Sequence, residues 1–340
     1  MQPRKLAAPD ETAAHLEFGV EIETVIPQSS GLQVGSYHRG NPVTMGRTPR
    51  GEVLQAPTFN GELWRADRDG SINIPRGYQA CEFVSPRLKG DAGIRALIDM
   101  VRFIVAIGGR VNPSCGLHVT VGLGWLTNDP KGLLEFAYRL ASNAHDNAWP
   151  IFAQTGTDRH RNHYCLPLSK PAFENLAKAT KAPSERVLEL VRSTGRGMVN
   201  FQKLLNAAPC VEFRAFAATL NEYKILHHVA TALGLVSKCK AVKRVCPWKP
   251  DAPRLRTKTA VEALERMWHL LRWSVSGTSS EPAYGLFGVM HQKFPSMKEV
   301  VSNAAHTFDR KWPAPFFTPA VPPPPAQPTP EPVPPTQAAA

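Results

Sequence analysis

Glu21 and Glu23 lie two residues apart in the segment LEFGVEIETVI, residues 16–26. Residues i and i+2 of a β-strand point to the same face, so both carboxylates should enter one space while Val20 and Ile22 face the other way. Neighbouring carboxylates repel each other unless a cation lies between them, and hard oxygen ligands suit Mg²⁺ or Mn²⁺ better than zinc. The pair is therefore a candidate metal site, although a solvated edge strand would show the same pattern.

Four later segments place a charged or metal-binding residue within an apolar strand or in a turn beside one. They are Asp67 and Asp69 in ADRDGS, Glu82 in CEFVSP, His118 in CGLHVTV, and Glu212 with Arg214 in VEFRAF. One buried acid can arise from packing alone. Several acids, a histidine and an arginine on one sheet face indicate a site, because buried charge costs free energy and is kept where it binds something.

The apolar periodicity places these residues on the elements of an α+β fold. Alternation in the last strand puts Phe216 on the face of Glu212 and Arg214, opposite Phe213. The polar stretch 27–60 is too long for an ordinary connection and predicts a functional flap or a partly disordered segment. Strands are expected over 16–26, 62–65, 72–74, 80–85, 114–123, 198–205 and 210–216, and helices over 91–107, 130–147, 222–241, 258–273 and 296–308, with two more within 170–192.

The chain is large enough for a substantial core, since 43% of its 340 residues are apolar. A proline run such as 322–325 could bind an aromatic groove on a protein partner. The predicted organisation is a flexible N-terminus over 1–15, a folded domain over 16–312 with its core motifs in 17–225 and a helical C-terminal part over 222–310, and a disordered proline-rich tail over 313–340.

The net charge limits the kinds of partner that the protein can bind, and the cysteine pattern indicates its cellular compartment. A net charge of +12 favours anionic partners such as nucleotides, phosphates or acidic peptides. Nucleic acid is the weaker alternative, since the sequence holds neither an aromatic RNA-binding run nor a zinc finger. The six cysteines are single, and neither a secretory signal nor a bilayer-length apolar helix is present, so a cytoplasmic protein without a membrane partner is expected.

The order of several motifs resembles one enzyme family. FGVEIE, DGSI, CEFVSP, VNPSCGLHVTVG, VNFQKL and VEFRAFAATLN follow one another over about 17–225, as in the amidoligase family of ATP-dependent carboxylate–amine ligases. That family is similar in turn to glutamine synthetase and to glutamate–cysteine ligase. The resemblance implies a curved, largely antiparallel sheet that holds metals on its concave face, with helices packed on its convex side.

The resemblance also implies roles for individual residues. Arg214 would contact the transferred phosphoryl group or the substrate carboxylate, as its planar fork allows. Arg196 and Asn200, in GRGMVNFQKL, would contact substrate or phosphate, although this stretch only approximates the family pattern. Thr120 stands where relatives commonly have a second histidine, so one metal or nucleotide contact is lost or replaced. The implied ligands of Mg²⁺ or Mn²⁺, between the protein and the ATP phosphates, are Glu21, Glu23, Glu82, His118 and Glu212.

Three functions fit these residues. In ligation, ATP first activates a small-molecule or peptide carboxylate as an acyl phosphate, which an amine then attacks; phosphoryl transfer needs neutralised charge more than a protein nucleophile. No Walker loop or Ser-His-Asp pattern is visible, and none is required. The alternatives are metal-dependent hydrolysis on the same carboxylate face and a catalytically degenerate basic adaptor, for which Thr120 is the best evidence.

Other residues favour packing or surface roles. Cys81 and Cys115 have no neighbouring base and are expected to be small buried apolar residues. His160 and His163 fall in a basic loop, which is either a substrate flap or a solvated charge cluster. The remaining candidates are His227 and His228, expected in packing or surface positions, and the core tryptophans Trp268 and Trp273.

Overall fold

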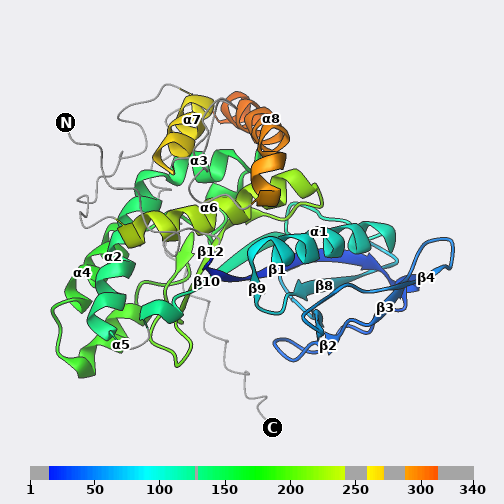
Figure 1. The fold of residues 1–340 in the computed structure, drawn as a ribbon, viewed down its shortest axis with the longest axis horizontal. Helices are drawn as coiled ribbons and strands as arrows, with labels where there is room; N and C mark the ends of the chain where they lie inside the picture. The colour runs from blue at the N-terminus through cyan, green and yellow to red at the C-terminus, as the bar shows by residue number, and fades with distance from the viewer. Residues whose placement is uncertain (1–14, 127–128, 242–258, 272–287, 313–340) are drawn as a thin grey trace, which may run out of the picture.

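The computed structural model describes residues 15–126, 129–241, 259–271 and 288–312. The expected flexible N-terminus, apart from His15, and the proline-rich segment 313–340 lie outside the described residues, as does Trp273. The described residues combine helices with an antiparallel sheet, which confirms the predicted α+β class (Figure 1). Most buried apolar side chains, from Leu16 to Phe308, belong to one core cluster.

An eight-stranded sheet forms the centre of the fold, and its strands pair antiparallel. The long strand β1 (Glu17–Pro27) lies between β10 (Gly116–Gly122) and β8 (Tyr78–Val84). The full order is β11 (Val199–Asn200), β12 (Cys210–Ala217), β10, β1, β8, β7 (Arg65–Asp67) and β2 (Asn41–Pro42), while β9 (Leu88–Lys89) pairs with the start of β1.

Segment 27–60 is folded rather than structureless. Its strands β3 (Met45–Arg47) and β4 (Val53–Gln55) form a hairpin that lies beyond the edge of the sheet in Figure 1. A second small hairpin pairs β5 (Thr58–Phe59) with β6 (Glu62–Leu63). Val43 follows β2 of the large sheet and precedes the β3–β4 hairpin, and its side chain is fully buried in the core. Of the two alternatives for 27–60, partial disorder is therefore wrong. The strand expected over 72–74 is also wrong, because this stretch follows a turn held by Asp69 and pairs with no strand.

Two helices, α1 (Gly90–Ala106) and α6 (Glu222–Ala241), lie over one face of the sheet (Figure 1). The bounds of α6 confirm the helix predicted over 222–241. No helix among the described residues is long and apolar enough to cross a membrane. The other helices are α2 (Pro130–Asp146), α3 (Ala148–Ala153), α4 (Lys170–Ala179), α5 (Ser184–Arg192), α7 (Ala260–Leu270) and α8 (Gly288–Lys311).

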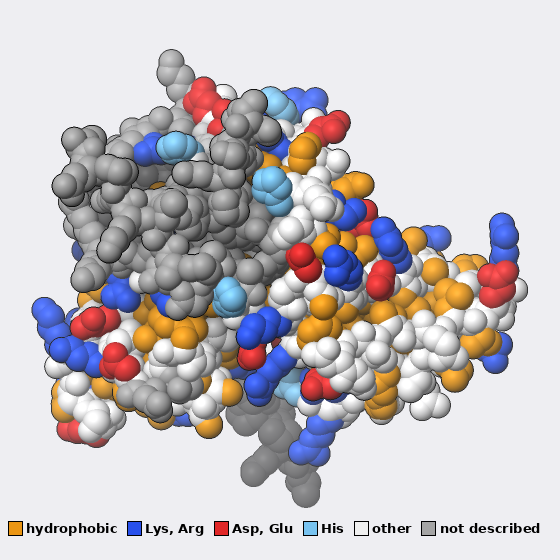
Figure 2. All heavy atoms as spheres, viewed as in Figure 1, with side chains coloured by type: hydrophobic (Ala, Val, Ile, Leu, Met, Phe, Trp, Pro, Cys, Tyr) orange, Lys and Arg blue, Asp and Glu red, His pale blue; other side chains and the backbone are white. Residues whose placement is uncertain are grey.

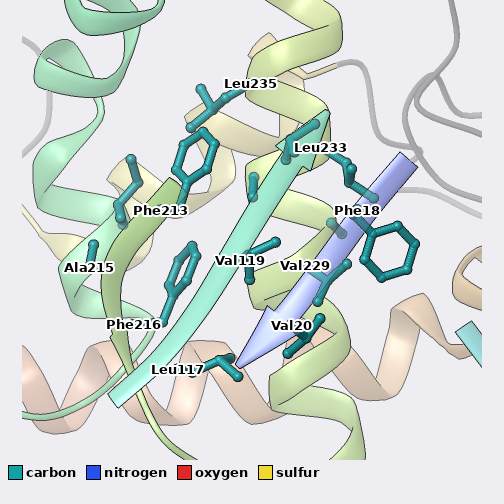
Figure 3. Packing of buried hydrophobic residues seen from close by; sticks show 14 of the residues in the cluster. Phe18, Val20, Leu117, Val119, Phe213, Ala215, Phe216, Val229, Leu233 and Leu235 are labelled. Carbon is teal, nitrogen blue, oxygen red and sulfur yellow. The ribbon is translucent and has the colours of Figure 1, made fainter. Parts of the chain in front are cut away.

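The sheet face beneath α6 is apolar. Val20 of β1 and Val119 of β10 lie among Val229 and Leu233 of α6 (Figure 3). Because successive residues of a strand point to opposite faces, the polar residues of the same strands are directed to the other face of the sheet. The core therefore fixes which side chains reach the open face.

A β-bulge in β12 changes the face of one residue. The pairing of β10 with β12 shifts between Leu117, opposite Phe216, and Val119, opposite Phe213, so β12 holds one more residue than β10 over this stretch. Phe216 consequently lies in the core (Figure 3). Its ring stacks on His228 of α6, with ring centroids 4.7 Å apart. The prediction that Phe216 shares the polar face is wrong, because strict alternation does not continue through a bulge.

Replacing Phe216 with alanine should lower the free energy of unfolding by about 3–5 kcal/mol, because the substitution leaves a cavity under α6. Urea unfolding followed by circular dichroism measures the change. Leu188→Ala, at a position that is 41% exposed, is the control and should change the free energy of unfolding by less than about 0.5 kcal/mol. An equally small effect of Phe216→Ala would place this side chain outside the core.

Candidate functional site

The strand register places acidic residues side by side on the open face of the sheet. Glu21 on β1 lies opposite His118 on β10, and Glu23 lies opposite Glu82 on β8. Asp67 on β7 lies opposite Glu82 in turn. Directly opposed residues of antiparallel strands have their Cβ atoms about 5 Å apart, so these side chains share one space.

His118 lies at the centre of this cluster. Its Nδ1 is 3.1 Å from Oε2 of Glu21, 3.6 Å from Oε1 of Glu212 and 3.8 Å from Oε1 of Glu82. Its Nε2 is 3.5 Å from Oε1 of Glu23. The structure thus brings together all five residues that the resemblance names as metal ligands, from the four strands β1, β8, β10 and β12. Only Glu21 among them is appreciably exposed, at 25% of its side chain.

The carboxylates of the cluster differ in their affinity for protons. Burial raises the pKa of Glu82 to about 8, and the negative charge of Glu21 adds to this effect. Burial also acts to raise the pKa of Glu21, but the hydrogen bond with His118 and nearby positive charges outweigh it and lower the pKa to about 2. The pKa of His118 is raised, because its bond to Glu21 and the charge of Glu23 outweigh burial. The charge of His118, 3.8 Å away, acts to lower the pKa of Glu82 but does not outweigh its burial.

Two sets of ligand atoms lie close enough to bind a divalent cation. One consists of Glu21, Glu82 and His118, and the other of Glu23, Asp69 and Glu82, with the ligand atoms of each set within 4.8 Å of one another. Glu82 belongs to both sets. Asp69 is absent from the ligands implied by the family resemblance, although its acidic turn ADRDGS pointed to it. Such oxygen-rich sets suit Mg²⁺ or Mn²⁺.

Glu212 belongs to neither set and is instead held by its neighbours. Its Oε2 accepts a hydrogen bond of 2.8 Å from Nδ2 of Asn200, and its Oε1 accepts one of 2.5 Å from Nη1 of Arg214. Burial acts to lower the pKa of Arg214, but the charge of Glu212 and this hydrogen bond outweigh burial and raise it. Thr120 lies opposite Glu212 in the strand register, where a second histidine was expected. The β12 end of the site is therefore electrostatically compensated.

A pocket of about 110 Å³ opens over the cluster. Arg196 contributes an exposed side chain to its wall, and its Nε lies 3.4 Å from Oε1 of Gln202. Four lining residues were missed by the sequence reasoning: Gln202 and Lys203, which stand in the quoted motif VNFQKL, and Tyr37 and His38, which no local pattern marks. The lining comprises Glu21, Tyr37, His38, Asp69, Glu82, His118, Arg196, Asn200, Gln202, Lys203, Glu212 and Arg214.

The residues expected in packing roles mostly occupy them. Cys81 and Cys115 are buried, and burial raises the pKa of both thiols. His160 corrects the sequence analysis: only 6% of it is exposed and its ring lies against Phe308, with centroids 5.1 Å apart, so it belongs neither to a flap nor to a solvated cluster. His163 is exposed as a surface loop residue. The remaining residues, His227, His228 and Trp268, are fully buried.

The fold and the site together define an α+β protein with a carboxylate-rich site suited to divalent cations. The family model described as "Putative amidoligase enzyme" matches residues 14–236, more than half of the chain, and the chain belongs to this family. This assignment confirms the resemblance seen in the order of the motifs and supports a carboxylate–amine ligase in general.

Solved structures with a distant similarity include a ligase complex. The crystal structure of the complex between the prokaryotic ubiquitin-like protein Pup and its ligase PafA matches 89% of this chain and 67% of that chain, with 11% sequence identity and a TM-score of 0.35. No curated protein matches the sequence.

Replacing Glu82 with glutamine should weaken Mn²⁺ binding by at least about tenfold, because Glu82 contributes to both ligand sets and loss of even an outer partner typically costs that much. Isothermal titration calorimetry with MnCl₂ measures the affinity. The matched control is Glu17→Gln, which changes an exposed glutamate of the same central strand β1 and should leave the affinity unchanged. Equal affinities of the Glu82→Gln variant and the unaltered protein would remove Glu82 from any metal site.

Proposed function

We propose that the protein is an ATP- and Mg²⁺-dependent carboxylate–amine ligase, which forms an amide or peptide-like bond through an acyl phosphate. One observation carries the proposal: a cluster of buried carboxylates and the cations Arg214, Arg196 and Lys203 line the same pocket. A polyanionic phosphate chain with its divalent cation needs both kinds of group at once. The family assignment supports the same class of reaction.

The residues fit a divalent cation. Glu82 belongs to two overlapping sets of oxygen and nitrogen ligands, and burial together with the charge of Glu21 raises its pKa, which a bound cation would lower. We assign the metal ligands to Glu21, Glu23, Glu82 and His118, with Asp69 added and Glu212 beside them. A bound Mg²⁺ or Mn²⁺ would neutralise the phosphate oxygens and so make the phosphorus more open to attack.

The remaining side chains would position and stabilise the reacting groups. Arg214 is held by Glu212, and its guanidinium can stabilise charge on the transferred phosphoryl group. Asn200 fixes the other oxygen of Glu212. Arg196 and Lys203 are exposed at the pocket and would attract the phosphates. An oxygen of the acid would attack the terminal phosphorus and release ADP; the amine would then attack the acyl carbon, releasing phosphate and a proton.

The pocket would hold the phosphates rather than a whole nucleotide. Its volume of about 110 Å³ is well below the roughly 300–1,000 Å³ of pockets that enclose a drug-sized ligand. The nucleoside would therefore extend past the rim, where Tyr37 is 55% exposed beside His38, with ring centroids 3.8 Å apart. Aromatic faces of this kind can stack on a base.

The proposal extends to the architecture and the partners. It takes the sheet to be of the glutamine synthetase type, which the antiparallel strand order and the helices α1 and α6 on one face support. One catalytic domain over 16–312, a protein-binding tail over 313–340 and a cytoplasmic location belong to it. Small-molecule or peptide substrates are favoured over nucleic acid, because basic and acidic side chains are interspersed on the face shown in Figure 2.

Hydroxylamine provides a test that does not require the natural amine, because it attacks acyl phosphates to give hydroxamates. Incubated with ATP, Mg²⁺, hydroxylamine and pooled carboxylic acids, the protein should produce hydroxamate and ADP in equal amounts. Glu212→Gln should reduce both by at least about 100-fold, since it releases the arginine that stabilises the transferred group. Glu17→Gln is the matched control and should retain full activity.

Two results would contradict the proposal. Cleavage of amide or phosphoester pools without ATP would support the hydrolase alternative instead. Full hydroxamate formation by the Glu212→Gln variant would remove the β12 end of the pocket from the chemistry.

A further inference from the structure

The turn over residues 36–39 brings His38 to the wall of the pocket. The backbone N–H of Arg39 donates to the carbonyl oxygen of Ser36 at 3.1 Å, and these two residues form an isolated antiparallel bridge. His38 is the third residue of the turn, and its φ of +58° is a left-handed conformation that glycine or asparagine usually provides. A histidine in such a conformation suits a position where the side chain itself is needed.

Two glycines hold this turn over the acidic end of the site. A Cβ atom added at Gly40 would collide with Oδ1 of Asp67, and one added at Gly35 would lie within 2.7 Å of backbone atoms from the other end of the turn. The N–H of Gly35 also donates to the carbonyl oxygen of Ala66 on β7 at 2.9 Å. Asp67 lies opposite Glu82 in the strand register, so the turn packs beside the glutamate that belongs to both ligand sets.

Among the described residues that line the pocket, His38 is a base that is free to take a proton. The acids either belong to the metal ligand sets or, like Glu212, are paired with an arginine. The imidazole of His38 is exposed, contacts the ring of Tyr37 and forms no hydrogen bond or ion pair with a described residue. Imidazoles accept a proton near neutral pH, whereas phenols do not. The charged groups around the same pocket are Glu21, Asp69, Glu82, His118, Glu212, Arg196, Lys203 and Arg214.

We propose that His38 is the general base for the amine substrate. This inference rests on the proposed ligase function. An alkylammonium ion must lose one proton before its nitrogen can attack, and the imidazole of His38 takes that proton. The nitrogen lone pair then forms the bond to the acyl carbon, the bond from this carbon to the phosphate oxygen breaks, and the phosphate leaves with a second proton from the nitrogen. A base at this position suits an alkyl amine, which is protonated at neutral pH.

A stacking surface or a phosphate-binding cation is the competing role for His38. Tyr37 supplies the ring face proposed for the nucleoside, whereas a base acts through a ring nitrogen, so the two neighbours can serve different groups. In either competing role, loss of the imidazole would slow the reaction with every amine. A general base matters only for an amine that arrives protonated.

Hydroxylamine and methylamine separate these roles, because at neutral pH hydroxylamine is mostly unprotonated and methylamine is an ammonium ion. The full chain is incubated with ATP, Mg²⁺, pooled carboxylic acids and both amines, and mass spectrometry measures the hydroxamates and methylamides. His38→Asn keeps a residue that tolerates positive φ; it should lower methylamide formation at neutral pH by at least about 100-fold and leave hydroxamate formation within about twofold. The methylamide loss should shrink towards about pH 10, where an alkyl amine loses its proton to water.

Two further variants sharpen the test. His38→Gly fits the left-handed turn and removes the ring, so added imidazole should restore methylamide formation, and this variant decides the question if His38→Asn does not fold. Arg39→Gln changes an exposed neighbour that is not among the described residues lining the pocket, and it should form both products as the unaltered protein does. Mn²⁺ affinity should be unchanged in all three variants, which shows that the carboxylate cluster stays intact.

Three outcomes would overturn the role of His38 as a base. They are equal methylamide formation by His38→Asn and the unaltered protein, a parallel loss of hydroxamate and methylamide in that variant, and hydroxamate without methylamide from the unaltered protein at neutral pH. Each leaves the ligase function standing, because the unaltered protein still forms hydroxamate with ATP. Absence of hydroxamate from the unaltered protein would instead contradict the ligase function and remove the base with it.

Discussion

Concentrated negative charge on one sheet face is the constraint on which the rest of the site depends. Glu23, Glu82 and Glu212 are almost fully buried and share their surroundings with Glu21 and one histidine, His118. Bringing like charges together out of water opposes folding, and the raised pKa of Glu82 is the direct expression of that cost. The same strands bury an apolar face under α6, which offsets it. The fold thus stabilises an arrangement that only a cation would fully relieve.

Antiparallel pairing gives this arrangement its precision. A slip of one residue in the register of β1 would turn both of its glutamates into the core, so the packing of Val20 and Ile22 fixes the position of the acids. The bulge in β12 determines which face the residues at the edge of the site point to. It allows Arg214 to remain beside the acids while Phe216, two residues later, packs under α6.

The site residues that lie on strands could be predicted from the sequence. The residues that tertiary contacts bring to the site, or bury away from it, could not. Glu21 and Glu82 stand in apolar strands, where alternation alone assigns their face. Tyr37 reaches the pocket from a segment that looks like a polar connection, because its folding depends on contacts far along the chain. His160 is buried by Phe308, which lies almost 150 residues later, and no local pattern records such a contact. Periodicity predicts a face, but not what another element places upon it.

The charges of the site are distributed unevenly across the strands. The end near β8 is suited to a metal, and the end near β12 is suited to an anion. Towards β8 neither Glu82 nor Asp69 forms an ion pair with a lysine or arginine among the described residues, and Glu82 has His118 at 3.8 Å, which favours a metal. Towards β12 the carboxylate of Glu212 is already held by Asn200 and Arg214, which favours positioning of an anion. A substrate whose phosphate lies between these ends would meet metal on one side and guanidinium on the other. His118 lies between the two ends, because its Nδ1 is 3.8 Å from Glu82 and 3.6 Å from Glu212. Its side chain therefore spaces the acids of the β8 end from the Glu212–Arg214 pair of the β12 end.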